Sequence, residues 1–205
     1  MTHYIANLPP RKTARIVGIL FIVATIAYAS GSAMIEPLLG NSGGITTALV
    51  FGSLLEFIDV ISVIAIGVLL FPILKNYSVS VARTYLGTRI FEAVFLLVSI
   101  ASIFWATFLG YEHAFQIAML VLGLGSLPLC YLLYQSKLIP RFISILGFAG
   151  YLSLTVYALL EILGTSTGVI LFIPGALFEI IFPIWLIAKG FNSSVIASAS
   201  TKADN

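Results

Sequence analysis

Five ionisable side chains fall inside stretches of sequence that are apolar enough to lie in a membrane: Glu56, Asp59, Arg89, Glu92 and Glu179. The first two are three residues apart, as are Arg89 and Glu92, so in a helix each pair shares one face. A charge at the centre of a membrane helix costs about 2.5–3.5 kcal/mol on insertion scales. We therefore expect all five side chains to point away from lipid, toward one another or toward water.

Arg89 is the expected centre of this cluster, because its planar guanidinium can serve two carboxylates and keeps its charge. Fully ionised, four carboxylates and one guanidinium carry −3, so some acids are protonated or a cation fills the site. We predict that the five residues form a ligand-binding or proton-coupling cluster. The alternative is a structural network that only fixes helix packing, but the unbalanced charge favours function.

Other chemistry finds little support in the sequence. The two histidines, His3 and His113, stand in no metal-binding motif, and there is no phosphate loop or nucleophile motif. The single cysteine, Cys130, lies in an apolar run and is expected to be a small buried hydrophobe. We expect no metal and no cofactor, and no residue can be assigned a catalytic role.

The composition is that of a membrane protein. Of 205 residues, 60% are hydrophobic and 9% are charged, against about 25% charged in soluble domains. The net charge of +2 is small and dispersed, which argues against nucleic acid as a partner and leaves the lipid bilayer. We predict an all-α bundle of six transmembrane helices in residues 1–190, followed by a polar tail, 191–205. The expected spans are about 14–35, 46–72, 84–109, 114–134, 142–163 and 168–189.

Lysine and arginine predict the orientation, because cytoplasmic loops carry an excess of both. With six spans, every basic connection falls on the side of the two termini, which we therefore expect to be cytoplasmic. The basic residues in these connections are Arg11, Lys12, Arg15, Lys75, Arg83, Lys137, Arg141, Lys189 and Lys202. A cleaved signal peptide is the competing interpretation of the N-terminus, but the apolar run continues through Met34 and Ile35.

Further features surround the cluster. Pro174-Gly175 and Pro183 predict breaks in the sixth span on both sides of Glu179. Three tyrosines are expected to add polar lining: Tyr28, Tyr151 and Tyr157. Two others, Tyr85 and Tyr111, are expected to be anchors at the membrane interfaces.

Three segments together resemble a known family: "RKTARIVGILFIVAT", "LEFIDVISVIAIGVLLFPILK" and "YLGTRIFEAVFLL". The closing "FEIIFPIWLIAKGF" is similar to its later part. The family is the uncharacterised domain-of-unknown-function family 4386, and the resemblance implies a multi-pass protein of the bacterial inner (plasma) membrane. It implies no activity and no cofactor.

Three functions stay open at this point. The first is binding or transport of a small molecule, a cation or a proton through the charged cluster. The second is an intramembrane enzyme that acts on a lipid-soluble substrate, with a carboxyl group as general acid. The third is a structural or accessory subunit. The sequence leaves the ligand and the oligomeric state undetermined.

Overall fold

The computed structural model describes residues 9–39, 45–104, 108–165 and 168–196, and this part of the chain is helical without a strand. Six helical segments are long and apolar enough to cross a membrane, which confirms the predicted all-α membrane fold. The helices are α2 (Pro10–Ile35), α3 (Thr47–Leu74), α4 (Val79–Phe104), α5 (Phe108–Ser136), α6 (Arg141–Ile162) and α7 (Ile173–Ala188). Two short 3-10 helices precede α3 and α7: η1 (Glu36–Leu38) and η2 (Gly168–Phe172).

Local sequence explains several helix ends. The Thr46 side chain caps α3 by accepting a hydrogen bond from the Leu49 N–H at 3.3 Å. Gly164 and Gly190 follow α6 and α7 with φ of 80° and 75°, the left-handed conformation in which glycine commonly ends a helix. Pro174 lies in the first turn of α7, where a proline loses no helical hydrogen bond.

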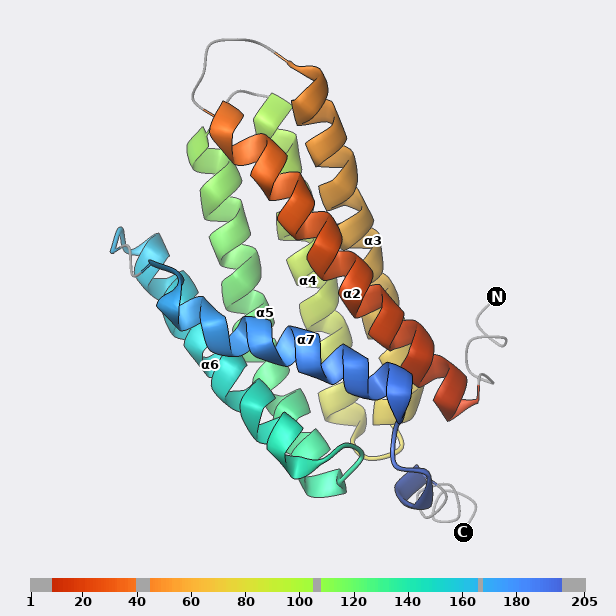
Figure 1. Cartoon of the computed structure of the whole chain (residues 1–205). Helices are drawn as coiled ribbons and strands as arrows, with labels where there is room; N and C mark the ends of the chain where they lie inside the picture. The colour runs from red at the N-terminus through yellow and green to blue at the C-terminus, as the bar shows by residue number, and fades with distance from the viewer. Residues whose placement is uncertain (1–8, 40–44, 105–107, 166–167, 197–205) are drawn as a thin grey trace.

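The six helices form a closed ring in chain order. Each helix packs on the next one, and α7 returns to pack on α2 (Figure 1). In Figure 1, α7 crosses α2 obliquely near the end where α2 begins and α7 finishes. Because α7 and α2 make the closing contact, all six helices line the interior of the ring.

Two glycines allow α7 to approach its neighbours α6 and α2 closely. A Cβ added at Gly150 of α6 would lie 2.9 Å from the Cα of Gly175 in α7, and one at Gly18 of α2 would lie 2.8 Å from the Pro183 carbonyl oxygen. Both distances are too short for a side chain. Small residues at such contacts let membrane helices pack backbone to backbone.

The helices are apolar outside and charged inside, as α4 illustrates. Arg89 and Glu92 are each 2% exposed, while Ile90 and Phe91 between them are 48% and 62% exposed. This is the reverse of a helix on a water-soluble protein. It is the pattern expected when hydrocarbon surrounds the bundle.

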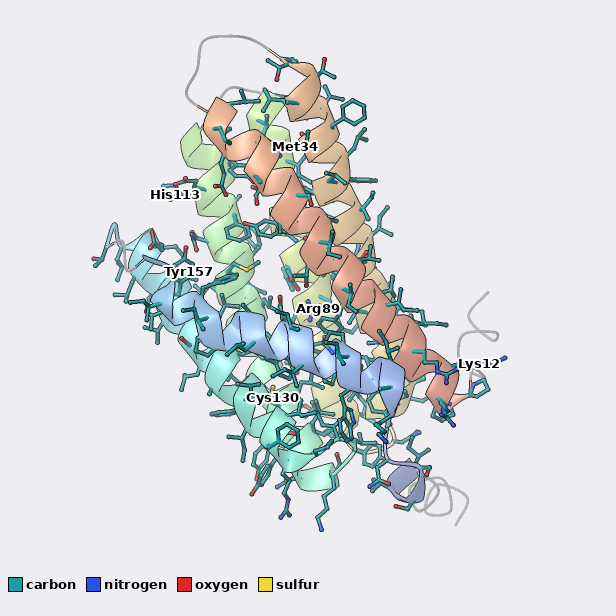
Figure 2. All side chains as sticks on the ribbon, in the orientation of Figure 1. Lys12, Met34, Arg89, His113, Cys130 and Tyr157 are labelled. Carbon is teal, nitrogen blue, oxygen red and sulfur yellow. The ribbon has the colours of Figure 1, made fainter. Side chains whose placement is uncertain are left out.

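The two ends of the bundle differ in charge. Apart from Arg89, every described lysine and arginine lies at the end where α2 begins and α7 finishes, which we call the basic end (Figure 2). The opposite end, which we call the acidic end, carries Glu36, Glu112 and Glu161. The sequence prediction that the basic end faces the cytoplasm rests on this separation.

The first residues of the expected C-terminal tail are folded onto the bundle. Phe191 is 7% exposed, and the Asn192 N–H donates a hydrogen bond to the Leu138 carbonyl oxygen at 2.9 Å. Residues 193–196 then form a helical turn. An apolar side chain and a backbone hydrogen bond thus hold the first part of the segment that the sequence predicted to be a polar tail. Residues 197–205 lie outside the described part of the chain.

Candidate functional site

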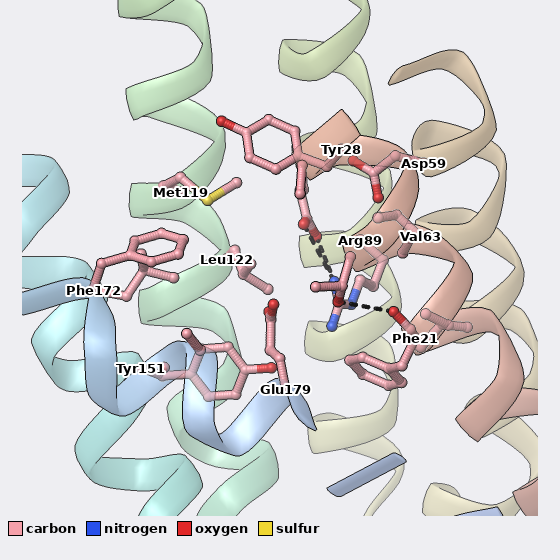
Figure 3. A pocket seen from close by; sticks show the side chains of 18 of the residues that line it. Phe21, Tyr28, Asp59, Val63, Arg89, Met119, Leu122, Tyr151, Phe172 and Glu179 are labelled. Atoms are coloured by element: carbon pink, nitrogen blue, oxygen red, sulfur yellow. Dashed lines mark hydrogen bonds and ion pairs between the residues drawn. The ribbon is translucent and has the colours of Figure 1, made fainter. Parts of the chain in front are cut away.

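A cavity of about 210 Å³ lies at the centre of the ring. All six membrane helices contribute to its wall (Figure 3). One lining residue from each of α2 to α7 in turn is Tyr28, Asp59, Arg89, Met119, Tyr151 and Glu179. Most of the remaining lining is aliphatic or aromatic, so polar groups are few in an apolar pocket, as in most small-molecule sites.

Arg89 uses only part of its guanidinium within the protein. Its Nε donates to the Tyr85 hydroxyl oxygen at 2.8 Å, and its Nη1 donates to the two carboxylate oxygens of Glu92 at 2.9 and 3.2 Å. Its Nη2 is buried and has no hydrogen-bond partner. The i,i+3 and i,i+4 spacings of these residues on α4 place all three on one helix face.

Packing holds the guanidinium in place. The Arg89 Cζ lies 5.1 Å from the centre of the Tyr85 ring and 5.5 Å from that of Phe21 on α2, distances at which a cation and an aromatic face attract. On the other side is Gly67 of α3, where a Cβ would lie 2.9 Å from the Arg89 Cβ. Gly67 therefore provides the space in which the arginine stem runs between α3 and α4.

Two carboxyl groups in the cavity lack partners. Neither Asp59 nor Glu179 has a hydrogen bond or ion pair within the described residues, although Asp59 is only 7% exposed. Glu179 points into the same space as Arg89, with Tyr151 beside it (Figure 3). The Tyr151 hydroxyl is also buried without a partner. Buried polar groups are nearly always hydrogen-bonded, so the unpaired Asp59 carboxyl and Tyr151 hydroxyl are exceptions in this interior.

Glu56 lies apart from the other four predicted residues. It does not line the cavity, and its Oε1 accepts a hydrogen bond from the Tyr111 hydroxyl of α5 at 2.5 Å. It is one helical turn closer to the acidic end than Asp59, on the same buried face of α3. The structure thus gathers Asp59, Arg89, Glu92 and Glu179 around one cavity and gives Glu56 a separate partner.

Two tyrosines have other roles than the sequence suggested. Tyr85 and Tyr111 were expected at the membrane interfaces, but they are 1% and 3% exposed and bond to Arg89 and Glu56. The signal for Tyr85 was present, because a residue four positions before Arg89 shares its helix face. Tyr111 comes from another helix, so no spacing in the sequence connects it to Glu56.

The prolines of the sixth span also differ from expectation. Pro174-Gly175 does not interrupt a helix but stands at the junction where η2 ends and α7 begins. Only Pro183 lies inside α7. The junction brings Gly175 and Glu179 to the cavity wall one turn apart.

The cavity wall reaches the outer surface at α2 and at α7. Ala29 and Ile180 line it and are exposed on the outer surface. Toward the basic end, the rings of Phe21 and Phe182 meet edge to face at 5.5 Å and join the two helices. Toward the acidic end, Tyr28 of α2 stacks on a ring of α5 at 4.9 Å. Ala29 and Ile180 both lie within helical segments that are long and apolar enough to cross a membrane.

The other chemical groups support no metal site. Among the described residues, no three His, Cys, Asp or Glu side chains come close enough together to hold a metal ion. Cys130 is 1% exposed and lies in the core with apolar neighbours. The site is thus one of carboxyl, guanidinium and phenol groups.

Comparison with known proteins agrees with the sequence resemblance. The model of the family described as domain of unknown function (DUF4386) matches residues 16–112 and 107–190. The chain belongs to this family. No curated protein and no solved structure matches it significantly. The family and the six apolar helices together make the chain a multi-pass membrane protein.

Proposed function

We propose that this protein binds a small organic cation in the central cavity, as a receptor or a transporter does. The supporting observation is the set of cavity groups without a protein partner: the carboxyl groups of Asp59 and Glu179, and the Nη2 of Arg89. Charged groups at membrane depth commonly mark substrate or ion pathways. A purely structural network would be expected to satisfy its own members.

The polar groups define the ligand's chemistry. Two carboxyl groups accept hydrogen bonds and attract a cation, so they suit a protonated amine. The Arg89 guanidinium is a hydrogen-bond donor in the cavity wall, so it suits a hydroxyl or carbonyl oxygen on the same molecule. The rest of the wall is apolar and suits a hydrocarbon or aromatic portion. A small amphipathic amine with a neighbouring oxygen meets all three conditions.

The dimensions of the cavity limit the ligand's size. A dry protein cavity of roughly 150 Å³ accepts benzene, and this one is about 210 Å³. A molecule of roughly ten non-hydrogen atoms therefore fits. Because the cavity wall reaches the outer surface within two membrane helices, we propose that the ligand partitions into the bilayer and enters sideways between α2 and α7.

The test compares ligands that differ in charge. Purified protein in detergent is heated with one of three ligands. Phenylalaninol has an amine and a hydroxyl group, hydrocinnamate is an anion, and butylbenzene is neutral. We expect phenylalaninol alone to raise the midpoint of thermal unfolding. Asp59→Asn and Glu179→Gln remove the charges without changing the shape, and they should abolish the shift. A folded wild type that responds to none of the three, or responds equally to all, contradicts the proposal.

The same cavity also supports a second candidate, an intramembrane enzyme with a lipid-soluble substrate. A cavity carboxyl group, Asp59 or Glu179, would act as general acid. This alternative predicts a changed lipid or isoprenoid profile in membranes from cells that lack the gene. An unchanged profile would count against it.

Orientation and membrane belong to the proposal as well. The charge difference between the two ends supports a cytoplasmic basic end, and with it both termini. The sequence resemblance supports the inner membrane of a bacterium.

A further inference from the structure

A second hollow lies at the basic end, remote from the central cavity. Its volume is about 580 Å³. The α5–α6 connection forms one wall, and the chain that follows α7 forms the other. Three basic residues line it: Lys137, Arg141 and Lys189.

The walls of this hollow are fixed by the backbone. The hydrogen bond from the Asn192 N–H to the Leu138 carbonyl oxygen joins the two segments. Leu138 and Ile139 are 0% and 2% exposed, so the connection is anchored in the core. Lys137 has φ of 56°, a left-handed conformation that non-glycine residues adopt only where their surroundings enforce it. The three basic side chains therefore project from backbone segments whose positions are fixed by packing and hydrogen bonding.

The groups in the hollow donate hydrogen bonds and carry positive charge. No described Asp or Glu side chain lines it. Trp185 is also a lining residue. The Arg141 guanidinium lies over the Tyr134 ring at 5.0 Å. Such a set of donors is complementary to a phosphate group.

We propose that this hollow binds the headgroup of an anionic phospholipid. The surroundings favour a lipid over a free phosphate ion. Phe142 and Ile145 of α6 and Ile184 of α7 are 61%, 57% and 55% exposed, so apolar surface suited to acyl chains continues along both helices from the hollow. Basic pockets between membrane helices on the cytoplasmic side are suited to anionic headgroups. This proposal is independent of the central cavity and of its ligand.

The test uses the fluorescence of Trp185. The chain has two tryptophans, so Trp105→Phe leaves Trp185 as the only reporter. The protein is reconstituted into phosphatidylcholine vesicles that contain a small fraction of lipid with brominated acyl chains. We expect brominated phosphatidylglycerol to quench Trp185 several times more effectively than brominated phosphatidylcholine at the same fraction. Added salt should reduce this preference.

Charge variants identify the residues responsible. Lys137→Gln and Lys189→Gln should each lower the preference for phosphatidylglycerol about fivefold, the equivalent of about 1 kcal/mol per basic residue. Lys75→Gln is the matched control, because Lys75 lies at the same end but outside the hollow. Equal quenching by the two lipids, or an equal loss with Lys75→Gln, overturns the proposal. So does full competition by millimolar inorganic phosphate, which indicates a site for free phosphate instead.

Discussion

The ion pair inside the ring allows stability and ligand binding to be separated by single substitutions. In Glu92→Gln the side chain keeps its shape and loses its charge. Arg89 is 2% exposed, and its Nη1 lies 2.9 Å from the Glu92 carboxylate, so the substitution leaves a buried cation without its counterion. Removing one partner of a buried pair costs about 3–5 kcal/mol. Because the glutamine oxygen still accepts one hydrogen bond, we expect a loss near the lower limit, about 3 kcal/mol.

The same reasoning gives a small effect for the cavity acids. Asp59 and Glu179 make no hydrogen bond within the described residues, so Asp59→Asn and Glu179→Gln remove no direct contact. We expect neither variant to be less stable than wild type, because an uncharged amide costs less to bury than a carboxylate. Their binding of phenylalaninol should nevertheless be lost.

The assay is reversible unfolding in mixed micelles, with helicity as the signal. The double variant Arg89→Met with Glu92→Gln is the control, since replacing both partners of a buried pair by uncharged groups is often neutral or stabilising. We expect the double variant to be more stable than Glu92→Gln alone. If Glu92→Gln is no less stable than Asp59→Asn, the pair does not carry the energy that its geometry implies.

Three further predictions concern packing, the outer hydrogen bond and orientation. Gly150→Ala should lower the unfolding midpoint because its methyl group meets the α7 backbone, whereas Gly87→Ala, with nothing within 4 Å of the new Cβ, should raise it slightly. Tyr111→Phe should cost about 1–3 kcal/mol in unfolding free energy, because it leaves the buried carboxyl group of Glu56 unpaired. The orientation is tested with single cysteines in a variant without Cys130. A cysteine at the basic end should react with an impermeant maleimide only in opened cells, whereas one at the acidic end should also react in intact cells. The reverse result would invert the orientation.

The helices and the inward position of the charges could be predicted because both follow from the cost of polar groups in hydrocarbon. That cost acts on each segment separately, so length and apolar runs suffice. It also predicts that Arg89 and Glu92 lie on one face, since their spacing fixes this within a single helix.

Contacts between helices were harder to predict, because they depend on tilt and on the axial offset of one helix against another. Glu56 and Asp59 share a face of α3 but differ by one turn, and that turn determines which group meets the cavity and which meets Tyr111 of α5. Similarly, a Pro-Gly pair is compatible with a helix break or a helix start. The 3-10 helix before Ile173 decides between them.

The contact between α7 and α2 has a consequence for biosynthesis. The ribosome makes α2 before α7, so the synthesis of four other membrane helices separates the two partners in this contact. Until α7 inserts, one side of the ring is missing. Arg89 and Asp59 then line an open groove that acyl chains can enter. A copy without α7 therefore presents polar groups that this helix covers in the finished ring.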